Sequence, residues 1–449
     1  MRENRKKTIR IALLVLILLL GIGYAALTAK LKVDGTVHID KATWDVHFEN
    51  VQVTSGSVEA NPAPTTNNVD TTEMTYTINF TKPGDFYEFT VDMVNDGTID
   101  AMVNLVSNKT YSSNGTTEIE LPSYLTSTTT YDDGIEINQN QLLAKETSEK
   151  IKVRVEFKKD ISTEDLPSDG DTTVVFKFVG NFKQADENAC PKATTFQDDD
   201  WDVIKCNVKN NPQTYPVGAT KEITLTDFGT HTLRVANNTT PVECSTTGFS
   251  QSACGFVVEF ADIITLHRMN PSSYTNENGD RNKGGWEYSD MRAYLNSSKY
   301  LEDQTSEIDY ASSGIYNALP TKLKSIISKT IVVSGYNKDI DNANFITEDK
   351  LYLLSRREVF NITGSDEDTA QNLTRQLDYY RENNVSGTGT NSYTSKTLSP
   401  SAPSYQNLWW LRSMHTNPGS HFNGVGYSGY TTSYVANNEY GVSPAFRIG

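Results

Sequence analysis

The pattern of hydrophobic and polar residues changes twice along the chain. Ile11–Ala29 is uncharged and rich in leucine, whereas residues 31–185 alternate between hydrophobic and polar positions in short segments. From residue 190 onward, segments typical of strands are interrupted by segments with helical spacing. We therefore predict three parts: an export signal or membrane anchor at 1–30, a β-domain at 31–185 and an α+β domain at 190–449.

The N-terminal uncharged run has the length of a membrane span. As a helix, Ile11–Ala29 would extend about 28 Å, close to the ~30 Å hydrocarbon core of a bilayer. Basic residues precede it, which predicts a cytoplasmic N-terminus and an extracellular remainder. A cleaved signal peptide is the alternative, because Gly23 and Ala25 fit the small-residue rule for cleavage. The protein is thus predicted to be held at the cell membrane by this helix, or to be secreted if the segment is removed.

Residues 31–185 are predicted to form an antiparallel β-sandwich. Turn clusters such as Lys82–Asp85 and Asn95–Thr98 separate the strand segments, and no long helical pattern interrupts them. The alternating segments are Thr43–Val51, Glu73–Phe80, Phe86–Val94, Lys150–Phe157 and Thr173–Val179.

Two motifs of this domain follow the export run in order: the turn KPGD (Lys82–Asp85) and, after a strand, VNDGTIDAMV (Val94–Val103). Together they resemble the TasA/camelysin family of Gram-positive bacteria, secreted β-sandwich proteins that build or decorate biofilm matrix. The resemblance implies a sandwich that can self-associate. Camelysin is described as a metalloprotease, but this sequence has no His-Glu-x-x-His and only His38 and His47 in the domain. We therefore expect neither protease activity nor a metal site here.

Residues 190–449 are predicted to be an α+β domain. Helices are expected after Ser289, after Pro320 and within Asp366–Asn383, where hydrophobic residues recur at helical spacing. The expected strands are Glu222–Leu225, His231–Ala236, Phe256–Phe260, Ile331–Val333, Leu351–Leu354, Leu408–Arg412 and Val442–Ile448.

All four cysteines of the chain lie at the start of this domain. Outside the cytoplasm two disulfides are the default, and sequence neighbours suggest Cys190–Cys206 and Cys244–Cys254, one of three possible pairings. A zinc site is the alternative, but the sequence offers neither a Cys-x-x-Cys pair nor a His-x-His pattern. We expect disulfides, and no metal or cofactor.

Seven ordered motifs in this domain, among them GGWEYSDMRAYLN (284–296), DKLYLLSRREVF (349–360), NLWWLRS (407–413) and GVSPAFRI (441–448), resemble an uncharacterised family of domains at the ends of Gram-positive surface proteins. The last two also resemble the C-type-lectin-like fold of formylglycine-generating enzymes and phage tropism proteins. The resemblance implies a C-type-lectin-like domain. It does not imply formylglycine-generating activity, which depends on cysteines near the C-terminus, because no cysteine follows Cys254.

The tract between Met414 and Gly441 consists almost wholly of Gly, Ser, Thr, Asn and Tyr, the composition of antibody binding loops. A solvated loop or hairpin without a ligand is the alternative. The tryptophans Trp286, Trp409 and Trp410 are expected in the core, and Arg412 and Arg447 as partners of buried carboxylates or carbonyls. The predicted ligand-binding residues are Tyr427, Tyr430, Tyr434, Tyr440, Asn423 and Asn437.

Charge and missing motifs exclude several functions. The net charge of −16 and the lack of a basic stripe argue against nucleic-acid binding. No nucleophile elbow, phosphate loop or dinucleotide fingerprint occurs, so we do not expect an enzyme. Asn276, Asn278, Asp280 and Glu287 have spacing like that of a calcium loop, but the required glycine is absent, which favours an ordinary turn.

We therefore predict a surface-exposed or secreted bacterial protein in which the β-sandwich carries an adhesion domain for an unknown glycan, cell-wall or protein ligand. Two alternatives remain: a structural component of biofilm matrix without a specific ligand, and an enzyme of unknown chemistry.

Overall fold

The computed structural model of the protein describes twelve stretches of the chain. They are residues 42–66, 72–162, 164–167, 173–272, 282, 284–301, 307–335, 344–362, 370–387, 389–398, 407–415 and 419–449. The predicted membrane segment lies outside these residues, as do Asn276, Asn278 and Asp280 of the calcium alternative. Within the described stretches, no helix is long and apolar enough to cross a membrane.

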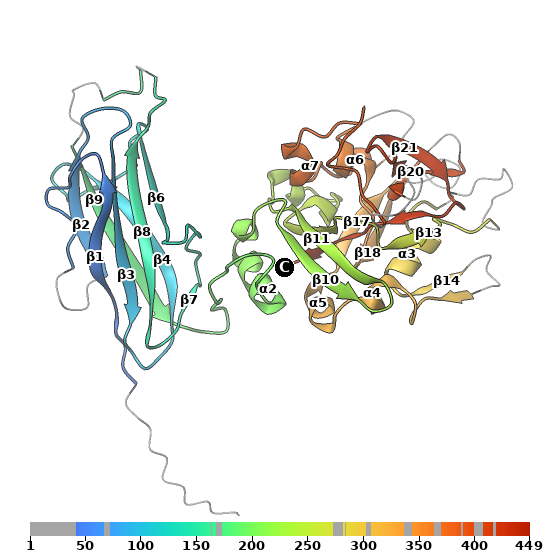
Figure 1. The fold of residues 1–449 in the computed structure, drawn as a ribbon, viewed down its shortest axis with the longest axis horizontal. Coiled ribbons are helices and arrows are strands. Elements are labelled where there is room, and N and C mark those ends of the chain that lie inside the picture. Colours follow the sequence, from blue (N-terminus) through green and yellow to red (C-terminus); the bar gives the residue numbers. More distant parts are fainter. Residues whose placement is uncertain are drawn as a thin grey trace, which may run out of the picture. The chain divides into compact units, whose positions relative to one another are not determined.

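Two antiparallel sheets account for the first half of the described chain (Figure 1). One sheet has the order β1 (Val46–Gly56), β3 (Phe86–Asn95), β8 (Thr147–Phe157) and β6 (Leu125–Tyr131). The other has the order β2 (Glu73–Asn79), β9 (Thr173–Gln184), β4 (Ala101–Tyr111) and β5 (Glu118–Ile119), with β7 (Leu142–Leu143) paired to β4.

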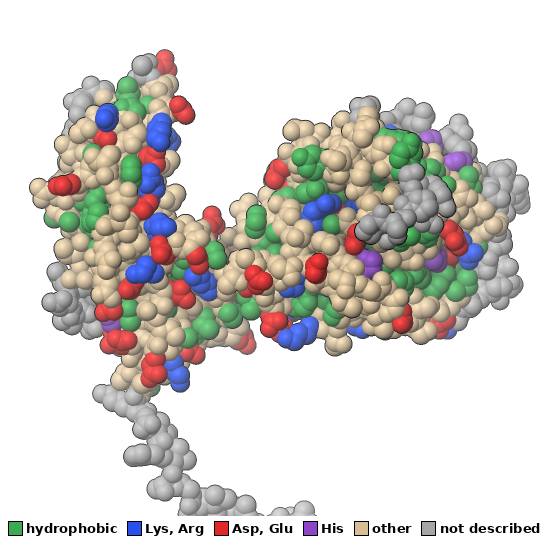
Figure 2. Space-filling view, in the orientation of Figure 1, with side chains coloured by type: hydrophobic (Ala, Val, Ile, Leu, Met, Phe, Trp, Pro, Cys, Tyr) green, Lys and Arg blue, Asp and Glu red, His purple; other side chains and the backbone are tan. Residues whose placement is uncertain are grey.

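One hydrophobic cluster joins the two sheets, as a sandwich requires. Tyr76 of β2 packs against Phe89 of β3 at 5.3 Å between ring centroids, and against Phe176 of β9 at the same distance. Along β8 every second residue from Ile151 is buried, so the period-two pattern of the sequence places one face of each strand in this core. On the side of this region that Figure 2 shows, acidic and basic side chains are interspersed. One such pair is Lys150 with Asp92, at 2.7 Å.

The KPGD turn before β3 is fixed by the side chain of Asp85, which is only 2% exposed. Its Oδ2 accepts hydrogen bonds from the backbone N–H groups of Thr81 and Lys82 and from the Thr81 hydroxyl, at 2.6–2.9 Å. Ser57 donates to Oδ1 at 2.9 Å. Burial alone would raise the pKa of Asp85, but these hydrogen bonds outweigh it and lower the pKa to about 2.

The described part of residues 190–449 is also dominated by strands, with short helices between them (Figure 1). One sheet has the order β10 (Thr220–Leu225), β11 (Gly229–Asn237), β12 (Phe256–Phe260), β23 (Ala445–Ile448) and β16 (Ile327–Ser328). A second has the order β13 (Thr265–His267), β22 (Tyr440–Val442), β19 (Trp409–Met414), β20 (His421–Val425) and β21 (Thr431–Val435). Two hairpins pair β14 (Lys299–Leu301) with β15 (Glu307–Asp309), and β17 (Thr330–Ser334) with β18 (Phe345–Asp349).

The helices of this region are short. The α-helices are α2 (Trp201–Asn210), α3 (Asp290–Leu295), α4 (Ile315–Ala318), α5 (Thr321–Ile326), α6 (Arg356–Phe360) and α7 (Asp378–Glu382). The 3₁₀ turns are η1 (Pro212–Thr214), η2 (Val242–Ser245), η3 (Gln251–Ala253) and η4 (Gln371–Leu373). Ser289 caps α3 as predicted, because its hydroxyl accepts from the Arg292 N–H, and α5 begins directly after Pro320.

A second hydrophobic cluster, confined to residues between Ala193 and Ile448, forms the core of this region. Trp286, Trp409 and Trp410 are fully buried in it, as predicted. Arg412 is also buried and pairs with Glu358 through both guanidinium nitrogens Nη1 and Nη2, which confirms the prediction of a carboxylate partner.

Both predicted disulfides are present. Cys190–Cys206 and Cys244–Cys254 have Cα–Cα distances of 5.5 and 5.9 Å. Each bridge closes a short loop, which limits the freedom of the unfolded chain.

Three predicted elements are corrected by the structure. Leu351–Leu354 is buried but not a strand, because its backbone is bonded mainly by isolated contacts: Asn296 Oδ1 accepts from Leu351 N–H, and Arg412 N–H donates to the carbonyl of Leu354. Within Asp366–Asn383, residues 370–383 contain η4 and α7 rather than one helix. Val442–Ile448 is two strands, because Pro444 has no N–H to continue the ladder.

Candidate functional site

The Tyr- and Gly-rich tract forms a β-hairpin where it is described. Strands β20 and β21 pair in register from His421↔Val435 to Val425↔Thr431. The turn is closed by hydrogen bonds from Gly426 N–H to the Tyr430 carbonyl and from Gly429 N–H to the Gly426 carbonyl, both 2.8 Å. On its inner side β20 pairs with β19, so the hairpin extends from the buried Trp-rich strand.

Gly424 of β20 and Gly426, which directly follows this strand, make room for tyrosine rings. A Cβ atom on Gly424 would lie 3.1 Å from the ring of Tyr434, and one on Gly426 would lie 2.6 Å from the ring of Tyr430. The ring of Tyr434 therefore lies over a glycine of the neighbouring strand and the ring of Tyr430 over a glycine of the turn, so both rings cover backbone. The glycines of the tract are thus explained by the tyrosine rings that pack on them.

Tyr434 and Tyr440 belong to an aromatic cluster built on Trp410. Their ring centroids lie 6.0 Å and 5.1 Å from that of Trp410 and 4.5 Å from each other. Both tyrosines are half-buried, and burial raises the pKa of Tyr434 above its usual value. These two predicted residues therefore pack on the core, and part of each side chain stays at the surface.

Tyr427 and Tyr430, at the hairpin turn, are the exposed members of the predicted set. Their exposed fractions are 54% and 36%. The two rings lie 6.4 Å apart between centroids, with an interplanar angle of 79°. Large aromatic side chains held at the surface in this way are a common feature of binding sites.

The two predicted asparagines have structural partners. Asn423 is 2% exposed, and its amide donates to the carbonyl of Ser413 at 3.2 Å, across β19 and β20. Asn437 is half-buried and donates to the hydroxyl of Ser272 at 3.1 Å. A ligand role for either residue remains a prediction, and Asn423 is not accessible in this structure.

Sequence reasoning missed a second segment that contacts the hairpin turn, residues 389–398. Asn391 N–H donates to the carbonyl of Ser428 at 2.8 Å, and the Thr394 hydroxyl donates to that of Gly429 at 2.6 Å. The segment exposes a further aromatic side chain, Tyr393, at 46%. Its sequence, SGTGTNSYTS from Ser386, has the same composition as the tract after Met414, which is the signal that could have identified it.

We call Tyr393, Tyr427, Tyr430, Tyr434 and Tyr440 the tyrosine surface. They come from the segment 389–398, the hairpin turn, β21 and β22. All of these tyrosines except Tyr393 are candidate ligand-binding residues predicted from the sequence.

A buried lysine anchors the segment 389–398. Lys396 has no exposed side-chain surface, and its ammonium donates to Glu259 Oε2, the Phe260 carbonyl and the Ser443 hydroxyl at 2.7–2.9 Å. It also lies 4.3 Å from the centre of the Trp409 ring, whose N–H donates to the carbonyl of Thr394. Through Trp409 and Thr394, a continuous series of contacts therefore connects the buried Lys396–Glu259 pair with the hairpin turn.

The ionic cluster around Lys396 contains two cations and one carboxylate. Arg234 donates to Glu259 Oε1 at 2.7 Å, and the Tyr380 hydroxyl donates to Oε2 at 2.7 Å. Burial lowers the pKa of Lys396 to about 8, although Glu259 acts in the opposite direction. Burial would raise the pKa of Glu259, but Arg234 and Lys396 lower it to about 2.

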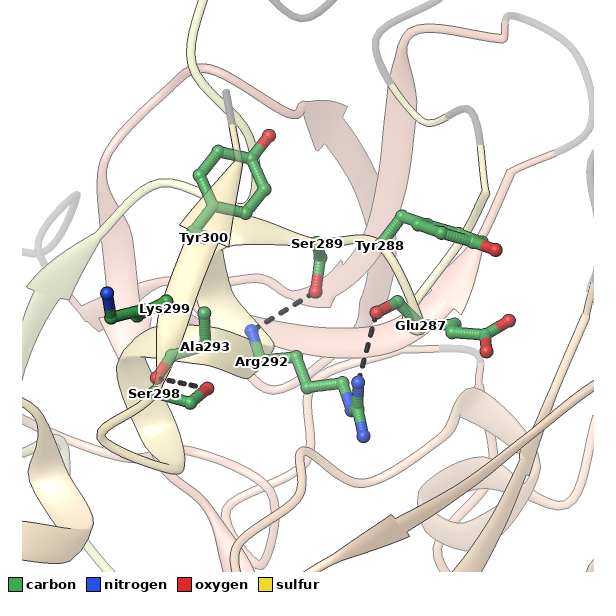
Figure 3. Close-up of a pocket in the computed structure, with 8 residues that line it drawn as sticks. All are labelled: Glu287, Tyr288, Ser289, Arg292, Ala293, Ser298, Lys299 and Tyr300. Carbon is green, nitrogen blue, oxygen red and sulfur yellow. Dashed lines mark hydrogen bonds between the residues drawn. The ribbon is translucent and has the colours of Figure 1, made fainter. Parts of the chain in front are cut away.

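A small pocket of about 220 Å³ lies elsewhere, beside α3 and β14 (Figure 3). Its walls include Tyr288, Tyr300 and Arg292, but the guanidinium of Arg292 is already paired with Asp349 at 2.7 Å and bonded to the Glu287 carbonyl. The hydroxyl of Ser289 is used to cap α3. Because Arg292 and Ser289 are engaged within the fold, this pocket is the weaker candidate site.

Glu287, the described member of the calcium alternative, lines this pocket. Within the twelve described stretches, no three His, Cys, Asp or Glu side chains gather as a metal site would require.

Comparison with known proteins gives one match. Residues 261–449 match the family model described as Domain of unknown function (DUF6273). The match contains the whole tyrosine surface but covers less than half of the chain, and its description names no activity. Searches of the curated proteins and of the solved structures found no match.

Proposed function

We propose that this protein is a bacterial cell-surface or secreted protein whose C-terminal domain, residues 190–449, recognises an extracellular ligand through the tyrosine surface. The β-sandwich of residues 31–185 would act as the spacer that carries this domain outward. Export is supported by the N-terminal uncharged run and by two disulfides, which form outside the cytoplasm. The resemblances to the TasA/camelysin family and to the C-type-lectin-like fold support the same proposal.

The observation that carries the proposal is that three exposed tyrosines lie on backbone that is held in place by hydrogen bonds. Tyr393, Tyr427 and Tyr430 are 36–54% exposed, yet the backbone beneath them is held by the hairpin ladder and by the segment 389–398. A rigid aromatic surface binds with less loss of conformational entropy than a mobile loop. Exposing such side chains adds little to the stability of the fold and does not improve solubility, which favours a binding role.

The test is binding of the purified, oxidised full chain to glycan, cell-wall and host-matrix panels. A double variant, Tyr427→Ala with Tyr430→Ala, should lose the binding that the wild type shows. Tyr288→Ala is the matched control, because Tyr288 is 56% exposed but lies at the pocket beside α3. Binding lost only in Tyr288→Ala would assign recognition to that pocket, and a well-folded wild type that binds nothing would refute the proposal.

A structural role in biofilm matrix is the second candidate, favoured by strand β1. This strand of 11 residues is the edge of its sheet in the described chain, and Val53 on it is 58% exposed. A long exposed edge can pair with another copy of the same chain. If it does, the full chain should form fibres that lengthen with protein concentration in electron micrographs, and Val53→Lys should suppress them. A strictly monomeric chain would exclude this role.

A further inference from the structure

We infer that the tyrosine surface binds an uncharged polysaccharide chain. This inference rests on the proposed function, because it assigns a ligand class to the same surface. Three properties of the surface carry it: the low charge of its segments, the hydroxyl groups around its rings, and its open shape.

The segments that form the exposed part of the surface contain almost no charge. Residues 422–438 and 386–395 include no Asp, Glu, Lys or Arg, although the chain as a whole carries a net charge of −16. Lys396, the next residue after the second segment, is fully buried. Among the described residues, the Lys or Arg side chain that hydrogen-bonds to the hairpin is Arg356, whose Nε donates to the Thr431 hydroxyl at 2.9 Å. A polyanion would find one partly buried cation here, and a polycation would find no carboxylate within these two segments.

The chemistry of the surface matches that of a sugar ring. A sugar ring presents C–H groups on its faces and hydroxyl groups at its rim, and the electron-rich face of an aromatic ring attracts polarised C–H groups. Tyr427 and Tyr430 pack edge to face at an interplanar angle of 79°, and each ring keeps part of its surface exposed, where a sugar ring could stack. Short hydroxyl and amide side chains accompany them, namely Ser428, Thr431, Thr432, Ser433, Asn391 and Ser392.

The shape of the surface favours a chain over a single sugar. Two pockets among the described residues, one beside α3 and one beside α4, are lined by none of the five tyrosines. A monosaccharide binds tightly only where a cavity surrounds it. On an open surface, several successive sugar units must each contact an aromatic ring, and Tyr393 lies on the segment bonded to the turn that holds Tyr427 and Tyr430.

A protein ligand fits these observations less well. Protein interfaces have a core of aromatic and aliphatic side chains with Arg at the strong contacts. The exposed large hydrophobic residues of the two segments are tyrosines alone: Tyr393, Tyr427 and Tyr430. Without exposed aliphatic side chains, the surface lacks the apolar centre that a protein partner would cover.

The experiment is affinity electrophoresis of the full chain in native gels that contain one soluble polymer each. The neutral probes are dextran, galactomannan and hydroxyethylcellulose, and the anionic probes are polygalacturonate and hyaluronan. We expect at least one neutral polymer to retard the wild type, with no change between about 50 and 500 mM NaCl, because no ion pairs contribute. Tyr427→Ala should weaken this association about tenfold.

Two further variants separate ring stacking from other effects. Tyr427→Phe keeps the ring and should bind within about twofold of the wild type, whereas loss of binding in Tyr427→Phe would overturn the stacking argument. Tyr288→Ala should bind like the wild type, because it leaves the tyrosine surface intact. Equal unfolding midpoints for all variants would show that the fold is unchanged.

The outcomes distinguish this inference from the proposed function. Binding to anionic polymers alone, with a steep dependence on salt, would overturn the inference. Binding to a host-matrix protein that is lost in Tyr427→Ala would overturn the polysaccharide class but retain the recognition surface. If neither the polymers nor the cell-wall and protein panels are bound, the inference and the proposed function both fail.

Discussion

The buried ionic cluster around Lys396 predicts that two substitutions, Glu259→Gln and Lys396→Met, will lower the stability of the fold by different amounts. Within the described part of the chain, Glu259 is the carboxylate that contacts both Arg234 and Lys396. Replacing Glu259 by glutamine leaves two buried cations without the carboxylate that bonds them. Replacing Lys396 by methionine leaves Arg234 and Glu259 as one complete pair. We therefore expect Glu259→Gln to destabilise the fold much more than Lys396→Met.

The magnitudes follow from burial and from the pKa of the lysine. Removing one partner from a buried ion pair costs about 3–5 kcal/mol, which we expect for Glu259→Gln. For Lys396, burial lowers the pKa from 10.5 to about 8, which corresponds to about 3 kcal/mol against the charged form. That value already includes the attraction to Glu259, so what Lys396→Met loses in addition is the hydrogen bonds to the Phe260 carbonyl and the Ser443 hydroxyl, at about 1 kcal/mol each. The net cost of Lys396→Met should therefore be about 0–2 kcal/mol.

The same pKa predicts a dependence on alkaline pH. Between pH 8 and 10.5 the unfolded chain holds a proton on Lys396 that the folded chain has released. Stability therefore rises with pH in this window, by up to about 3 kcal/mol, relative to a variant without the lysine. Lys396→Met should lack this rise.

Urea denaturation followed by tryptophan fluorescence is the assay. Trp44 is the only tryptophan in residues 31–185, and the other four lie between residues 201 and 410, so the signal reports chiefly on the C-terminal region. Equal losses of unfolding free energy in Glu259→Gln and Lys396→Met at pH 7 would refute the reasoning. So would a wild type and a Lys396→Met variant that respond identically between pH 8 and 10.5.

Three further predictions concern other parts of the fold. Serine at both Cys244 and Cys254 opens a bridge between residues 10 positions apart, so the unfolding free energy should fall by about 2–4 kcal/mol, and an unchanged urea midpoint would contradict this. Gly426→Ala places a methyl group 2.6 Å from the ring of Tyr430; it should cost about 1–3 kcal/mol and weaken ligand binding, measured by denaturation and by the panel assay. Asp85 has a folded pKa of about 2 against 3.8, so its stabilisation of about 2 kcal/mol is present above pH 3.8 and lost as the pH falls toward 2. Acid unfolding followed by circular dichroism should show this loss in the wild type and not in Asp85→Asn.

The strands of the sandwich could be predicted because their signal is local. In Glu73–Phe80 and Phe86–Val94 the alternation of hydrophobic and polar residues directly reflects one buried face, and the structure has β2 and β3 at these positions. The same holds for Ser289, whose N-cap role depends on residues within one turn.

The incorrect predictions concern segments whose side chains are buried but whose backbone groups do not form the hydrogen bonds of the predicted element. Leu351–Leu354 is hydrophobic because it is buried, but a hydrophobic run does not specify which groups its backbone bonds. Helix α2 was not predicted although Ile204 and Val208 lie four positions apart on its buried face, because polar residues occupy most of its other positions.

The tyrosine surface was predictable from composition only in part. The tract after Met414 indicated a hairpin or loop with exposed tyrosines, but composition cannot separate Tyr427, which is exposed, from Tyr434, which packs on Trp410. Tyr393 lies more than thirty positions earlier, and only the folded chain brings its segment to the turn through Asn391.

The central claim is that ligand contact occurs at the tyrosine surface. Hydrogen–deuterium exchange of the full chain, with and without a ligand selected from the panels, locates the contact without altering a residue. We expect slower exchange confined to residues 389–398, 419–435 and 440–442, which form the segment bonded to the hairpin turn, the hairpin and strand β22. Protection at residues 287–300 around the pocket, or on strand β1 alone, would contradict the claim.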